Sequence, residues 1–151
     1  MSKVVHILRG PSGCGKSTIA GDILSKIGAH RSVICSADDF FMVGGEYEFN
    51  PRKLPEAHSF CMSRFLNAIE RGVECIIVDN TNIRPWKYEN YAQIAELSGY
   101  DVNIESVIVE TVDEMRACAR RNSHDVPLES IAIQAVNFVH DKFGHERMME
   151  M

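Results

Sequence analysis

The stretch Gly10-Pro-Ser-Gly-Cys-Gly-Lys-Ser17 places three glycines within six residues and ends on a lysine and a serine. It follows residues 3–9, an apolar run rich in β-branched side chains. It precedes residues 17–27, in which isoleucine and leucine recur at helical spacing. The sequence therefore predicts a strand, a glycine-rich turn and a helix in direct succession.

The glycine-rich stretch fits the pattern G-x-x-x-x-G-K-[ST], which binds nucleotide phosphates when it lies between a strand and a helix. Its glycines let successive backbone N–H groups converge on a phosphate, and the helix N-terminus adds partial positive charge. Lys16 is expected to contact the β- and γ-phosphates, and Ser17 to hold Mg²⁺. With ATP as the predicted ligand and GTP as the alternative, the predicted nucleotide-binding residues are Gly10, Pro11, Ser12, Gly13, Cys14, Gly15, Lys16, Ser17 and Thr18.

The rest of the chain alternates between strand-like and helix-like segments. Short, nearly continuous apolar runs, typical of strands buried on both faces of a parallel sheet, occupy residues 32–35, 75–78 and 101–109. Helical spacing occupies residues 54–71, 85–98, 113–121 and 128–142. This alternation predicts a three-layer α/β domain with a mainly parallel sheet of about four strands. The domain is expected to span residues 1–143, followed by a mobile tail, residues 144–151, that lacks clear periodicity.

Composition excludes several classes of protein. The 151 residues suit one globular domain, and a net charge of −5 would repel a polyanion unless basic residues gather locally. Five scattered cysteines argue against a disulfide framework and favour a reducing compartment. No apolar run reaches the length of about 18 residues that a membrane helix needs. We therefore expect a cytoplasmic protein without a membrane partner.

Acidic residues follow two of the predicted strands. Asp38 and Asp39 come just after residues 32–35, and Asp79 comes just after residues 75–78. In open α/β sheets this edge binds ligands, so a carboxylate here can accept a proton from a hydroxyl or hold Mg²⁺. Asp79 is therefore predicted to share the metal with Ser17. A solvated turn or a helix cap remains the alternative interpretation of Asp38 and Asp39, and an aspartate that only caps the strand is the alternative for Asp79.

Arg120 and Arg121 end a predicted helix and precede the polar segment 122–127, a candidate short lid. Arginine can stabilise the charge of a phosphoryl group in transfer, but two arginines also suit the C-terminus of a helix.

Other side chains are better explained by packing than by chemistry. His58 and Cys61 are one helical turn apart, but two ligands do not make a metal site. Trp86 and Tyr91 could stack a base, although their spacing also suits a helix face.

Five motifs in order carry a family resemblance that covers nearly the whole chain. They are Leu8-Arg-Gly-Pro-Ser-Gly-Cys-Gly-Lys-Ser-Thr18, Ser36-Ala-Asp-Asp-Phe-Phe41, Tyr47-Glu-Phe-Asn-Pro51, Val78-Asp-Asn-Thr-Asn82 and Arg120-Arg-Asn-Ser-His-Asp-Val-Pro127. Together they resemble the P-loop kinase-like ATP-binding domains related to the 5′-kinase part of polynucleotide kinase. The resemblance implies that Asp38 is the general base, that Asp79 lies beside acceptor and metal, and that Arg120 or Arg121 belongs to a lid.

Three functions remain open on the sequence alone. The leading hypothesis is an ATP-dependent phosphotransferase that moves the γ-phosphoryl group to a hydroxyl, with the 5′-hydroxyl of DNA or RNA as the suggested acceptor. The acidic charge balance and small size also favour a small-molecule kinase. The third is a non-catalytic ATP-binding switch or partner module. The acceptor separates the first two hypotheses, and turnover separates both from the third.

Overall fold

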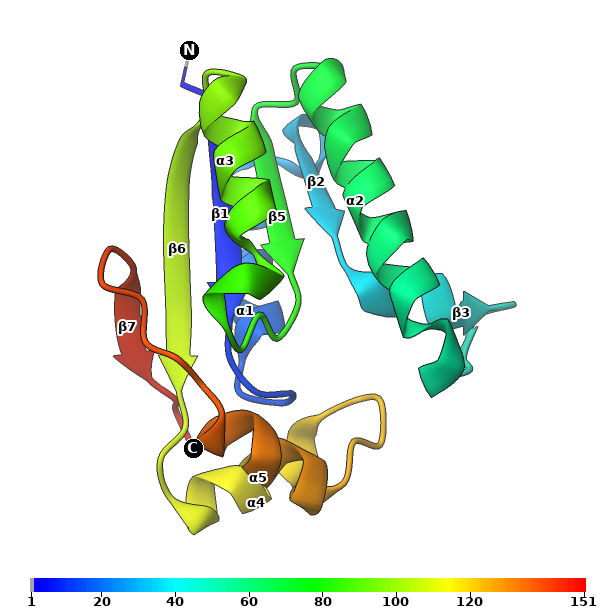
Figure 1. The fold of residues 1–151 in the computed structure, drawn as a ribbon, viewed down its shortest axis with the longest axis vertical. Helices are drawn as coiled ribbons and strands as arrows, with labels where there is room; N and C mark the ends of the chain where they lie inside the picture. Colours follow the sequence, from blue (N-terminus) through cyan, green and yellow to red (C-terminus); the bar gives the residue numbers. More distant parts are fainter. Residues whose placement is uncertain (1) are drawn as a thin grey trace.

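The computed structural model describes residues 2–151, and its centre is a parallel five-stranded sheet with the strand order β2-β5-β1-β6-β7. Helices cover both faces, with α2 and α3 on one side and α1 on the other (Figure 1). The strands of the sheet are β1 Val4–Arg9, β2 Ser32–Cys35, β5 Cys75–Asp79, β6 Asp101–Ile108 and β7 His145–Met148. The helices are α1 Lys16–Ile27, α2 Leu54–Glu70, α3 Glu89–Leu97, α4 Val112–Arg121 and α5 Leu128–Val136.

Short elements connect this framework. A two-stranded antiparallel hairpin, β3 Met42–Val43 and β4 Glu46–Tyr47, projects beside the N-terminal end of α2 (Figure 1). Four 3₁₀ turns complete the chain: η1 Ala29–Arg31, η2 Ala37–Phe41, η3 Pro51–Lys53 and η4 Pro85–Lys87.

Two apolar clusters hold the layers together, one on each face of the sheet. Side chains of β1 and β5 alternate between the faces, because successive residues of a strand point to opposite sides. Val5 and Val78 join α2 and α3 in one cluster, while Leu8 and Ile77 join α1, α4 and α5 in the other. The predicted α/β fold with buried parallel strands is confirmed.

The C-terminal part of the chain differs from its prediction. The sheet has five strands instead of about four, because β7 pairs with β6 in parallel, from Glu105 with His145 to Ile108 with Met148. Residues 145–148, which the sequence assigned to a mobile tail, thus form a strand of the sheet. All four residues of β7 are exposed, so backbone pairing holds this edge strand without an alternating hydrophobic pattern.

Two helices are shorter than their periodicity predicted. The helix expected over 128–142 ends at Val136, after which the backbone of Val139 donates to Ile83 O at 3.0 Å and accepts from Arg9. The segment expected as one helix over 85–98 divides into η4 and α3. In the first case hydrogen bonds to distant residues replace those that would have continued the helix.

Arg9, at the end of β1, is fully buried and supplies a hydrogen bond to the segment that follows α5. Its guanidinium donates to Asn82 O at 2.8 Å, to Val139 O at 2.6 Å and to Ser106 Oγ at 3.3 Å. It also lies 4.4 Å from the ring centre of Phe138. Burial lowers the pKa of Arg9, but these contacts satisfy its donors and tie three parts of the chain together.

Across residues 2–151, no helix combines the length and the hydropathy needed to cross a bilayer.

Candidate active site

The phosphate loop lies between β1 and α1, at the C-terminal edge of the sheet, as the sequence predicted. Gly13 and Gly15 have φ values of 79° and 112°, which residues with a Cβ rarely adopt. A Cβ on Gly13 would also lie 2.2 Å from the carbonyl oxygen of Cys118 on α4. The first turn of α1 has no acidic residue and no side-chain cap. Its first backbone N–H groups are thus available to bind an anion.

Lys16 lies within the curve of this loop and is 9% exposed. Its Nζ donates to Gly10 O at 2.8 Å and to Pro11 O at 3.1 Å, and it lies 3.9 Å from Cys14 Sγ. Phosphate oxygens are charged and therefore stronger partners for an ammonium group than these carbonyls. The side chain is placed where it can exchange loop contacts for contacts with a phosphate.

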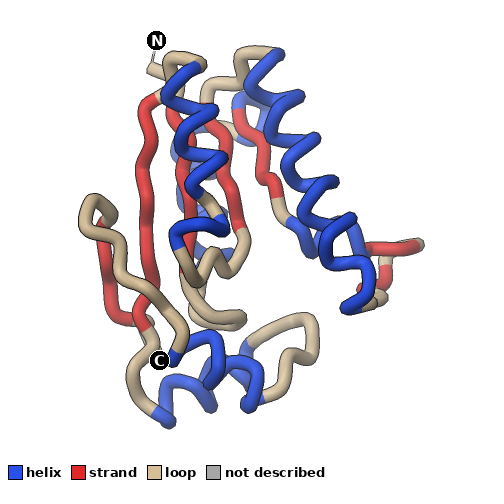
Figure 2. The backbone as a smooth tube through the Cα atoms, viewed as in Figure 1, coloured by secondary structure: helices blue, strands red, loops and turns tan. Residues whose placement is uncertain are grey.

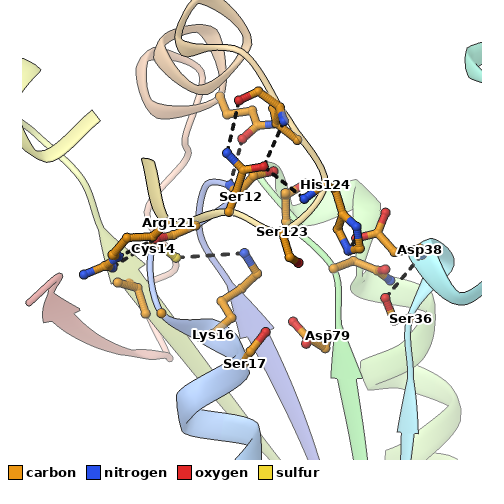
Figure 3. A pocket seen from close by; sticks show the side chains of 18 of the residues that line it. Ser12, Cys14, Lys16, Ser17, Ser36, Asp38, Asp79, Arg121, Ser123 and His124 are labelled. Carbon is orange, nitrogen blue, oxygen red and sulfur yellow. Dashed lines mark hydrogen bonds and ion pairs between the residues drawn. The ribbon is translucent and has the colours of Figure 1, made fainter. Parts of the chain in front are cut away.

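Ser17 and Asp79 face the same cavity from α1 and β5 (Figure 3). A hydroxyl and a carboxylate are oxygen ligands of the kind that Mg²⁺ prefers, so the donor set fits the predicted metal. Burial raises the pKa of Asp79; nearby Lys16 opposes this rise, while Asp38 and Asp39 add to it. A divalent cation would relieve the same unfavourable burial of negative charge.

Asp38 and Asp39 diverge from the turn η2. The capping residue of this turn is Ser36, whose Oγ accepts from the backbone N–H of Asp38, so the aspartates are not its caps. Asp39 forms an ion pair with Arg64 on α2 at 3.0 Å. Asp38 also lines the cavity; Tyr47 donates its hydroxyl to Oδ1 at 3.3 Å, and His124 Nε2 lies 3.7 Å from Oδ2.

The two arginines at the end of α4 have different surroundings. Arg121 donates to Gly13 O in the phosphate loop through Nε at 3.2 Å and Nη2 at 2.9 Å. Its Nη1 donates to Glu150 O at 2.5 Å. Arg120 is exposed and does not line the cavity that residues 2–151 enclose. The structure thus brings Arg121, and not Arg120, to the predicted phosphate site.

Residues 122–127, which we call the lid, form a compact loop between α4 and α5 beyond the edge of the sheet (Figure 2). The side chain of Asn122 organises this loop. Its Oδ1 accepts from the backbone N–H groups of His124 and Val126 at 3.2 and 2.8 Å, and its Nδ2 donates to Val126 O at 3.1 Å. Asn is typical of such turns, and this was the signal available in the sequence.

One cavity of about 1220 Å³ connects the phosphate loop with Asp38. The half around Asp38, which we call the acceptor half, is lined by Phe41, Tyr47, Phe49, Leu54 and His58. The phosphate half includes Gln134 on α5, which accepts from the backbone N–H of Ser12 at 2.9 Å, and the C-terminal residues 147–151. Our sequence analysis missed Gln134, Tyr47 and the C-terminal residues as part of the site.

Of the side chains that the sequence attributed to packing, two are buried and two are not. Tyr91 is buried in the core, as expected, whereas Trp86 is 60% exposed. Cys61 is buried, and His58 lines the acceptor half. Within residues 2–151, His, Cys, Asp and Glu form no group of three or more that could hold a metal.

Comparison with known families gives one match that covers most of the chain. The AAA_33 family, described as an AAA domain, matches residues 5–138. NEDD4-binding protein 2 of Homo sapiens is 34% identical over 128 residues, which make up 85% of this chain and 7% of that protein. The chain therefore corresponds to a small part of this relative's length.

Solved structures with the same fold include a gluconokinase and proteins with other names. A gluconokinase from Sinorhizobium meliloti 1021 superposes with a TM-score of 0.62 and 14% identity, over 99% of this chain and 83% of its own. A chain of the Pnkp1/Rnl/Hen1 RNA repair complex superposes with a TM-score of 0.68 and 17% identity, over 90% of this chain and 44% of its own. The tunicamycin resistance protein of Deinococcus radiodurans superposes with a TM-score of 0.63 and 14% identity, over 98% of this chain and 86% of its own. At these identities the likeness concerns the fold alone.

Proposed function

Because the chain belongs to the AAA_33 family of P-loop kinase-like domains, we propose that it is an ATP-dependent phosphotransferase acting on a hydroxyl group. The observation that carries this proposal is the single cavity that joins the phosphate loop to Asp38. A nucleotide held by the loop and a hydroxyl held at Asp38 would meet within it. Proximity of this kind accounts for a large part of catalysis in phosphoryl transfer.

In the proposed reaction the acceptor oxygen attacks the γ-phosphorus. The new oxygen–phosphorus bond forms as the bond between the γ-phosphorus and the β–γ bridging oxygen breaks, and ADP leaves. Asp38 accepts the proton of the hydroxyl, Lys16 neutralises charge on the β- and γ-phosphates, and Arg121 is the arginine placed to stabilise the transferred group. Ser17 and Asp79 would hold Mg²⁺, which supplies positive charge to the phosphate oxygens.

The proposed acceptor class includes the 5′-hydroxyl of DNA or RNA, consistent with the fold shared with a chain of an RNA repair complex. A small uncharged hydroxyl compound is a second candidate, and the lining of the cavity favours it. Within the described chain, the lysine and arginine residues that line the cavity are Lys16, Arg121 and Arg147, while aromatic rings and histidines surround Asp38. Phosphates of a nucleic acid would need basic residues near the acceptor half.

The test is transfer of labelled phosphate from ATP to a panel of 5′-hydroxyl DNA and RNA oligonucleotides, nucleosides and sugars. Asp38→Asn keeps the size of the side chain but removes the base, so transfer should fall by roughly 10²–10⁴-fold while ATP still binds. Asp39→Asn should have a smaller effect, because Asp39 is paired with Arg64. Lys16→Ala serves as the variant that loses nucleotide binding and turnover.

Calorimetry and thermal melts for each protein separate lost chemistry from lost folding. Transfer by Asp38→Asn at the wild-type rate would show that Asp38 is not the base. Tight binding of ATP by the wild type without transfer to any acceptor would instead support the non-catalytic binding module.

A further inference from the structure

His124 on the lid reaches across the cavity to the opposite wall. Its imidazole stacks on the ring of Tyr47, with ring centres 3.9 Å apart and planes inclined by 29°. Its Nε2 lies 3.7 Å from Oδ2 of Asp38, whose other oxygen accepts the hydroxyl of Tyr47. Figure 3 shows His124 directed from the lid toward Asp38. Two segments distant in sequence, residues 38–47 and the lid, thus meet at one carboxylate.

The lid itself does not hold the imidazole. Nδ1 of His124 is buried, and no residue between 2 and 151 hydrogen-bonds to it. Asn122 fixes the backbone at His124 and Val126, so the loop presents the side chain without binding its ring. The position of the imidazole therefore depends on its contacts with Tyr47 and Asp38.

The hairpin that carries Tyr47 has few backbone hydrogen bonds, although the ring of Tyr47 packs against the core and contacts Phe41, with ring centres 6.1 Å apart. β3 and β4 pair through two residues each, and beyond them Glu48 N donates to Phe41 O at 2.8 Å. A two-stranded hairpin of this length is marginally stable by itself. Stacking with His124 therefore adds to the contact with Phe41 in placing Tyr47, and through it Asp38.

We propose that His124 is a positioning residue that closes the lid onto the hairpin and orients the Asp38 carboxylate for the acceptor hydroxyl. This role rests on the proposed phosphotransferase function. The ring and the nitrogen contribute separately: the ring stacks on Tyr47 and closes the lid, and Nε2 faces Oδ2 of Asp38 and restricts its rotation. Closure also keeps water away from the γ-phosphate, which favours transfer to the acceptor over hydrolysis.

Two substitutions separate these contributions. His124→Phe keeps a ring for stacking and removes the nitrogen, whereas His124→Gln keeps a polar donor and removes the ring. His30→Gln is the matched control, because His30 is exposed on η1, which precedes β2 at the N-terminal edge of the sheet. All three are compared with the wild type by thermal melt before any other measurement.

Hydrogen exchange of the ligand-free proteins tests closure without any acceptor. We expect His124→Gln to speed exchange in residues 42–49 as well as in the lid, since the two segments support each other, and His124→Phe to leave both near the wild-type rates. If His124→Gln exchanges like His30→Gln in residues 42–49, the proposal is overturned.

Kinetics test positioning with the best acceptor from the panel above. His124→Gln should raise the acceptor KM roughly two- to tenfold, the size of one lost ring contact, and should raise the share of ATP lost to hydrolysis. His124→Phe should lower kcat roughly tenfold with little change in acceptor KM, because Nε2 no longer restricts the rotation of the Asp38 carboxylate and the base is less well oriented. The KM for ATP should stay near the control value in both. Kinetic constants equal to those of His30→Gln would overturn the proposal.

Failure of the proposed function has a different signature. If the wild type phosphorylates no acceptor but His124→Gln alone speeds exchange in residues 42–49, the closing contact is supported and the phosphotransferase function is refuted. If transfer is robust and the His124 variants match the control, the function stands and the role of His124 is refuted.

Discussion

Individual residues in the cavity carry charges that the fold does not neutralise by itself. Asp79 is the clearest case, since burial raises the pKa of its carboxyl while Lys16 only partly offsets the effect. An ionised carboxylate at such a position lowers the stability of the ligand-free protein, and a bound cation would offset this cost. Perturbed carboxyl groups of this kind gather at functional sites.

Asp79→Asn should therefore raise the Tm of the ligand-free protein at neutral pH and weaken binding of MgATP, by roughly 10–100-fold if Asp79 contacts the metal or its bound water. The pKa of Asp79 in the folded protein lies above the ordinary value of 3.8. Between these two pKa values the folded protein therefore binds more protons than the unfolded chain. Wild-type stability from this group then rises as pH falls. The advantage of the variant should shrink toward low pH, as thermal melts across a pH series would show.

Arg121 and Arg120 form a second contrast at this scale. Arg121→Ala removes three hydrogen bonds, two to Gly13 O and one to Glu150 O, together with the charge beside the phosphate loop. We expect transfer to fall by roughly 10²-fold, the size measured for one lost transition-state donor. Arg120→Ala should change little, since its side chain is exposed and does not line the cavity. Equal losses in steady-state assays would return both arginines to a helix-end role.

Among the elements, α4 connects the sheet to the lid and begins with a capping box. Thr111 accepts from the backbone N–H of Glu114 at 3.1 Å, and Glu114 accepts from the N–H of Thr111 and of Glu110, each at 3.0 Å. These backbone donors hold the pKa of Glu114 below its ordinary value of 4.5. The capping box stabilises the N-terminus of α4, and Arg121 lies at the C-terminus of the same helix.

Thr111→Ala should lower the free energy of unfolding by about 1 kcal/mol, the usual contribution of an N-cap. Urea unfolding at neutral pH measures this change.

Glu114→Gln should also lower the free energy of unfolding, but only at pH values where the wild-type carboxylate is ionised. A depressed pKa contributes stability that is present above the unfolded value and is lost as pH falls through the folded value. Urea unfolding at neutral pH and at a series of pH values falling progressively below 4.5 tests this: a gap that stays undiminished through the whole series would contradict the assignment.

At the scale of the whole molecule, the C-terminal residues complete the phosphate half of the cavity. Met149 is buried beside Cys118 of α4, and its N–H donates to Ile108 O at 3.1 Å. The next residue supplies the carbonyl that Arg121 binds. The edge strand β7 and the residues after it therefore link the sheet to the candidate phosphate site.

Removal of residues 144–151 should lower the Tm by several degrees, because a buried Met and a strand pairing are lost, and should weaken ATP binding. Glu150→Ala is the control: Arg121 binds the backbone carbonyl of Glu150, so this variant should bind ATP as the wild type does. The measurements are thermal melts and calorimetric titration with ATP. An unchanged ATP affinity in the truncated protein would exclude the C-terminal residues from the site.

The sequence by itself determined the phosphate loop and the α/β order of the chain. Gly13 and Gly15 adopt backbone angles that favour glycine, and β5 is buried on both faces, so local conformation and solvent exclusion leave a direct pattern in the residues. Lys16, Ser17, Asp38 and Asp79 could be predicted because each lies at a fixed distance from the end of a strand. Their catalytic and metal-binding roles stay predictions.

Only the tertiary structure decided how the lid, the hairpin and the C-terminus meet. His124 faces Asp38 across 86 positions of the chain, and Arg121 reaches Gly13 across 108. Neither contact leaves a periodic signal in the sequence. The edge strand β7 escaped prediction for a related reason: its residues are exposed, and its bonds are made by the backbone, which is the same in every residue except proline.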